Sequence, residues 1–126
     1  MKTSTLCKAL LKDACDETLS FYRSMLTTQD LASVKDEEWR AIIGLARELK
    51  PHQQEILLSF ARLASIDAIS TFCGAIDGTT QVGGQFVAFS LTDESGTEHA
   101  GSMQDRAVAG AECNTVIELK LEHHAA

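Results

Sequence analysis

The sequence has few of the features that mark loop-rich, secreted or membrane-spanning proteins. Its 126 residues include one proline and eight glycines, too few for a loop-rich or collagen-like chain. No run of apolar residues reaches the roughly 18 that cross a bilayer. Lys8, Lys12 and Asp13 interrupt the stretch that would form the apolar part of a signal peptide. These absences predict a soluble, cytoplasmic protein with no membrane partner.

Basic residues are scarce in the last third of the chain. Residues 78–126 contain only Arg106 and Lys120 against seven acidic residues, and the whole chain has a net charge of −7. Nucleic-acid binding depends on phosphate neutralisation by Lys and Arg, so the composition argues against a nucleic-acid partner. It favours a basic protein partner, which the acidic charge would attract. Plain solubility is the simpler explanation of the same charge.

The common catalytic and cofactor-binding motifs are also missing. The chain has no phosphate-binding loop, nucleophile elbow, metalloprotease helix or EF-hand loop. None of its four cysteines forms a CxxC pair, so we expect reduced cysteines that pack in the interior. The residues His99, Asp105 and Cys113, with two histidines near the C-terminus, match no metal-ligand spacing. The sequence therefore predicts no catalytic residue, no metal and no cofactor.

What the sequence does contain is helical periodicity in its first 77 residues. Apolar residues recur at helical spacing over residues 4–26, 34–49 and 51–76. Ser33 and Asp36 resemble a capping box, Pro51 favours a helix start, and Gly78 favours a helix end. The apolar residues of 51–76 cover more than one face, which predicts a central helix buried on several sides. We expect the aromatic residues of these stripes to pack in the core; they include Trp39, Phe60 and Phe72.

The remaining residues show strand-like alternation. Residues 86–91 predict a strand, residues 97–103 a short partner strand, and residues 115–123 a third strand with one apolar and one charged face. The predicted fold class is α+β, with three N-terminal helices packed on a small C-terminal antiparallel sheet of about three strands. It forms a single domain over residues 1–126, with a helical part at 1–77 and a sheet part at 78–126.

The first functional hypothesis is a small acidic, non-enzymatic protein-interaction domain. Such a domain would act as a bacterial-type inhibitor, immunity-type, regulatory or adaptor protein that binds a basic protein partner. The missing catalytic set and the charged strand motivate this hypothesis. The expected partner-binding residues are Glu98, Glu118, Lys120 and Glu122.

The alternative is a small-molecule-binding protein or small enzyme with a pocket between the third helix and the sheet. Its expected pocket residues are Trp39, His52 and Asp67. Asp67 lies among apolar neighbours, so its carboxylate must reach solvent or find a partner such as Arg62 or Arg40. His52 and Glu55 form either an acid–base pair or, more simply, a surface pair one turn apart. A homodimer through the apolar first helix is a third expectation.

Overall fold

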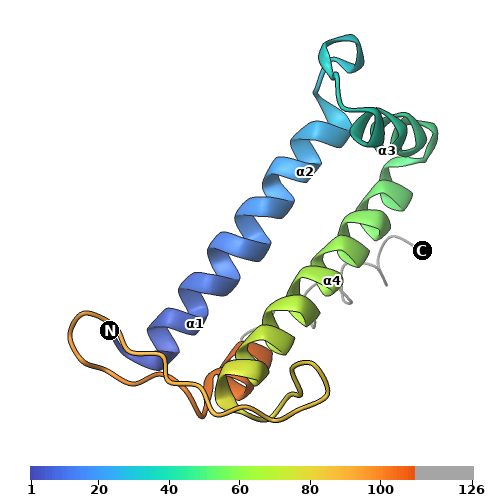
Figure 1. Cartoon of the computed structure of the whole chain (residues 1–126). Coiled ribbons are helices and arrows are strands. Elements are labelled where there is room, and N and C mark those ends of the chain that lie inside the picture. Colours follow the sequence, from blue (N-terminus) through green and yellow to red (C-terminus); the bar gives the residue numbers. More distant parts are fainter. Residues whose placement is uncertain (110–126) are drawn as a thin grey trace.

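The computed structural model describes residues 1–109 and shows a helical protein (Figure 1). Helices account for 68% of the described residues. The elements, in chain order, are α1 (Thr3–Leu11), the π-helix η1 (Lys12–Asp16), α2 (Glu17–Thr27), the 3-10 helix η2 (Leu31–Ser33), α3 (Glu37–Glu48) and α4 (Pro51–Asp77). A long irregular segment follows α4, and residues 103–109 are helical again. The three predicted helical regions therefore correspond to α1–η1–α2, α3 and α4.

The predicted α+β class is wrong. The described residues contain no strand, only two isolated bridges that join Val82 to Gln85 and Thr92 to Glu98. Within residues 1–109 no strand lies beside residues 86–91, and the expected partner segment 97–103 runs into the helix at 103–109. Isolated strand pairs are only marginally stable, so alternation without a neighbour gives irregular backbone. The third predicted strand, residues 115–123, lies outside the described residues.

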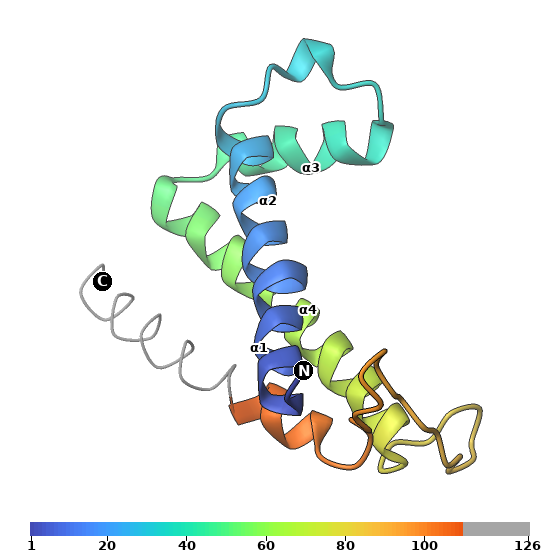
Figure 2. The same ribbon diagram turned by 90° about the vertical axis from the view of Figure 1, so that its left-hand side faces the viewer.

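The architecture is a long helical hairpin closed by a crossing helix. The continuous helix α1–η1–α2 and helix α4 lie side by side, and α3 crosses them at one end (Figures 1 and 2). The core runs between the two arms as three clusters. The first, near α3, contains Leu19, Leu26, Val34, Ile43, Ala46 and Leu58; the second, in the middle, contains Cys15 and Ile66; the third, at the far end, contains Cys7, Cys73, Met103 and Ala107.

Local side-chain chemistry sets the helix ends. Asp36, rather than Ser33, caps α3, because its Oδ1 accepts the backbone N–H of Trp39 at 2.8 Å. Pro51 occupies the first turn of α4, where its missing N–H costs nothing. Gly78 ends α4 with a φ of 77°, a conformation that glycine adopts without strain, and this confirms its predicted capping role.

The π turn η1 keeps one face of the first arm against α4. The buried residues Cys7, Cys15 and Leu19 are separated by multiples of four, a wider repeat than the 3.6-residue turn. The wider π turn between α1 and α2 compensates for the resulting drift. It also brings Asp16 toward α4, where its Oδ1 lies 3.9 Å from Nε of the buried Arg62.

Helix α4 is far less buried than its sequence predicts. Phe60 is 69% exposed and Phe72 is 64% exposed, so the expectation that they pack in the core is wrong. Only 22% of the most apolar 18-residue window of α4 is buried. By length and composition alone α4 could cross a membrane, which corrects the expectation that no segment could.

Candidate functional site

The expected pocket residues do not form one site. Trp39 packs against the rings of Phe21 and Tyr22, with centroid distances of 6.2 Å and 5.3 Å. His52 lies in the first turn of α4, and Asp67 follows 15 residues later, roughly 22 Å along the helix axis. Both side chains are exposed. A single small ligand cannot contact His52 and Asp67 together, and no sheet is described against which the expected pocket would form.

The two polar partners considered for these residues are engaged elsewhere. Glu55 pairs with Arg23 across the two arms, with Nη2 and Oε2 2.8 Å apart, instead of serving His52. Arg62 faces Asp16 on the first arm. Asp67 reaches solvent on the outer face of α4, which is one of the two alternatives open for it.

Glu98 is the only expected partner-binding residue within the described residues. Its carboxylate accepts hydrogen bonds from the Ser90 hydroxyl and from the backbone N–H groups of Leu91 and Ala100. These bonds hold its pKa down to about 2, with the Ser90 hydroxyl as the largest cause. Glu98 therefore stabilises its own loop. Glu118, Lys120 and Glu122 lie outside the described residues.

Asp77 organises the loop end of the hairpin. Its Oδ1 accepts the backbone N–H groups of Gly101 at 2.6 Å and Met103 at 3.1 Å, and its Oδ2 accepts that of Gln104 at 2.8 Å. The last residue of α4 thus caps the helical stretch 103–109 and closes the long loop.

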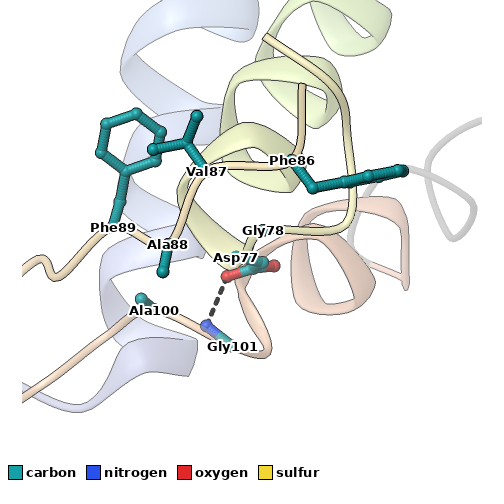
Figure 3. Close-up of a pocket in the computed structure, with 8 residues that line it drawn as sticks. All are labelled: Asp77, Gly78, Phe86, Val87, Ala88, Phe89, Ala100 and Gly101. Carbon is teal, nitrogen blue, oxygen red and sulfur yellow. Dashed lines mark hydrogen bonds between the residues drawn. The ribbon is translucent and has the colours of Figure 1, made fainter. Parts of the chain in front are cut away.

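A shallow pocket lies beside this cap (Figure 3). Its volume is about 450 Å³, within the range of small-molecule sites. Figure 3 shows Phe86 and Phe89 projecting to opposite sides, and the carboxylate of Asp77 turned to Gly101. Because that carboxylate is occupied by backbone N–H groups, the lining offers little specific recognition. The lining residues are Asp77, Gly78, Phe86, Val87, Ala88, Phe89, Ala100 and Gly101.

A hydroxyl, an imidazole and a carboxylate meet where the loop joins α1. The Oγ1 of Thr3 lies 2.9 Å from Nδ1 of His99, and Nε2 of His99 lies 3.1 Å from Oδ2 of Asp93. Acyl-transfer triads use the same order of groups. Here the imidazole is only 2% exposed, and none of the three residues lines the pocket of Figure 3. The contacts therefore fasten the loop to the start of α1.

The cysteines offer no nucleophile among the described residues. Cys7, Cys15 and Cys73 are free and buried, as the sequence predicts; Cys113 lies outside the described residues. Burial raises the pKa of all three thiols, that of Cys73 to about 11. Their reactive thiolate forms are scarce near neutral pH. In the described part of the chain, no group of three His, Cys, Asp or Glu residues is placed to hold a metal ion.

The most unusual surface is the outer face of α4. Ile56, Phe60, Leu63 and Phe72 are between 48% and 69% exposed, and Ala64 and Ala68 between them are exposed as well. Large apolar patches of this kind mark interaction sites. The sequence did signal this surface, because apolar residues covered more than one face of residues 51–76. The predicted burial of this helix on several sides is wrong.

No family model, curated protein or solved structure matches the chain. What the protein does must therefore be inferred from the geometry of its own residues. In the described residues, side-chain and backbone hydrogen bonds hold the loop at one end of the hairpin, and an apolar face of α4 is exposed.

Proposed function

We propose that the protein is a non-enzymatic, cytoplasmic interaction module that binds a protein partner on the outer face of α4. The observation that carries this proposal is the exposure of Phe60 and Phe72, which are 69% and 64% accessible on a long, well-formed helix. Exposing large apolar side chains to water is unfavourable, and a partner helix that covers them removes this cost. The mode would be an apolar helix laid against another, with anchors at helical spacing.

Charge complements this apolar face. Asp67 is the only charged residue between Leu63 and Thr71, and it lies exposed within the apolar surface. The net charge of −7 would steer a partner with basic residues around its own apolar strip. The hypothesis of a basic protein partner, made from the sequence, is thus kept as a proposal, with α4 in place of the charged strand.

The test is affinity capture with matched variants. Phe60→Glu removes an exposed anchor of the α4 face (69%), while Phe86→Glu changes a similarly exposed phenylalanine (64%) in the loop. We expect wild type and F86E to retain a stoichiometric protein partner and F60E to lose it. Equal capture by all three proteins, or a wild type that captures no other protein and is also monomeric, would overturn the proposal.

A further inference from the structure

The exposed side of α4 carries a ridge of side chains spaced four residues apart, which winds obliquely around the helix. The row consists of Ile56, Phe60, Ala64, Ala68 and Phe72, all of them exposed. Rows of this spacing form the ridges by which helices interdigitate, and packing two such ridges together gives the commonest class of helix crossing, near −50°. The row reads large, large, small, small, large along the chain.

This order makes the row complementary to itself when it runs backwards. A two-fold axis through Ala64 would place Phe60 of one copy across from Ala68 of the other. The same axis would place Ile56 across from Phe72 of the other copy. Phe60 therefore meets the small Ala68, whereas Ile56 and Phe72 meet at the ends of the row, where crossing helices diverge and leave room for large side chains. The small residues near the crossing point let the helices approach closely. A closed two-fold interface of this kind uses the same patch on both copies.

We infer that the occupant of the α4 face is a second copy of this chain, packed antiparallel across Ala64. The inference rests on the proposed function, but its partner is acidic instead of basic, so the match between the two apolar rows takes the place of steering by charge. The reverse, parallel pairing would set Asp67 against Asp67 of the other copy. In the antiparallel pairing the two carboxylates lie at different heights, about 9 Å apart along the helix axis. Charge thus selects the antiparallel arrangement.

The available area sets the strength of this dimer. Residues 56–72 form a strip roughly 24 Å long. A stable standard interface buries about 800 Å² on each partner, and a single pair of helices over this length falls below that. The dimer therefore belongs to the weaker class, with dissociation constants around the micromolar range.

Alternative occupants predict different behaviour. A bilayer would have to accept Arg62 and Asp67 near the middle of α4, and charged residues at that depth are unfavourable. It would also separate Arg62 from Asp16 on the first arm. An unrelated protein would leave the isolated chain monomeric.

Sedimentation of the full chain over about 1–500 µM tests the inference. We expect a monomer–dimer equilibrium that F60E weakens at least about tenfold and that the loop variant F86E leaves unchanged. Circular dichroism checks that both variants keep the helical content of the wild type. A monomer at the highest concentration, or a dimer that F60E does not weaken, overturns the inference.

Cross-linking tests the register. Ala64→Cys places a thiol at the two-fold axis, so we expect oxidation to give a disulfide-linked dimer. Thr71 is also exposed on the same helix, but Thr71→Cys would face residue 57 of the other copy, and it serves as the matched control. Unmodified chain under the same oxidation gives the background from the native cysteines. Linkage through position 71 and not through position 64 overturns the antiparallel register.

Two further measurements separate failure of the inference from failure of the proposed function. If the chain is monomeric but captures another protein through Phe60, the second-copy inference fails and the proposed function stands. If the wild type binds phosphatidylcholine vesicles and F60E does not, the occupant is a membrane and both fail. If the chain is monomeric and F60E changes neither vesicle binding nor capture, both fail as well.

Discussion

Single residues at the loop end decide how the protein responds to acid. The pKa of Glu98 falls from its ordinary value of 4.5 to about 2, chiefly through the Ser90 hydroxyl and then through backbone N–H groups. The pKa of Asp93 is also lowered, first by Ser95 and then by His99. A carboxyl with a lowered folded-state pKa stabilises the fold above its ordinary pKa. That contribution is lost as the pH falls toward the folded value.

We therefore expect the loop to loosen between about pH 4.5 and about pH 2. The amide signals of Leu91 and Ala100, which donate to Glu98, report the change in an NMR titration. Glu98→Gln, which keeps one acceptor oxygen but does not titrate, should flatten both curves over this range. A midpoint near 4.5 in the wild type would show that these hydrogen bonds do not hold the carboxylate.

Two adjacent isoleucines allow the contribution of a buried side chain to stability to be compared with that of an exposed one. Ile43 is 0% exposed in the cluster beneath α3, whereas Ile42 is 40% exposed on the same helix. Ile43→Ala should lower the free energy of unfolding by about 2–5 kcal/mol, since it removes buried methyl groups and leaves a cavity. Ile42→Ala makes the same chemical change and should cost less than about 1 kcal/mol. Urea denaturation followed by circular dichroism measures both, and equal losses would contradict the assigned core.

At the scale of elements, the sequence predicted the helices well because their signals are local. Helical spacing, Pro51 and Gly78 all act within a few residues, and α4 ends at Asp77, one residue beyond the predicted end. The predicted strand at 86–91 does not form, because a strand needs a neighbouring strand. The alternation of apolar and polar residues within one segment does not show whether such a neighbour exists. The contact of Thr3 with His99 spans 96 residues and left no signal in the sequence. The exposed face of α4 was visible as an excess of apolar residues, but the sequence alone did not show that nothing in the first arm covers it.

The junction between α4 and the helical stretch 103–109 depends on one carboxylate. Asp77→Ala removes the acceptor of three backbone N–H groups and should lower the free energy of unfolding by about 1–3 kcal/mol. It should also speed amide exchange at Met103 and Gln104. Asp67→Ala on the same helix changes an exposed carboxylate and should stay within about 0.5 kcal/mol of the wild type. If both variants unfold alike, Asp77 does not fasten the loop end.

For the whole molecule, an elongated hairpin explains why so much apolar surface remains exposed. Each arm of a two-helix hairpin can cover only one face of the other, and α3 covers only one end (Figure 2). A small chain already buries a modest fraction of its surface, and an extended shape lowers that fraction further. The outer face of α4 is thus a consequence of the architecture, and association is the direct way to cover it.

The salt dependence of the dissociation constant distinguishes the two kinds of protein partner, a second copy of the chain and a basic protein. Two copies that each carry a net charge of −7 repel, and the Debye length shrinks from roughly 30 Å at 0.01 M salt to roughly 10 Å at 0.1 M. The dissociation constant of the homodimer should therefore fall as salt is added, whereas that of a complex with a basic protein should rise. Asp67→Asn removes the only exposed charge within the strip, so it should tighten the homodimer most at low salt and little at high salt. Sedimentation at the two salt concentrations gives the sign directly. A homodimer that weakens with salt would mean that attraction between opposite charges, and not the apolar row, holds the copies together.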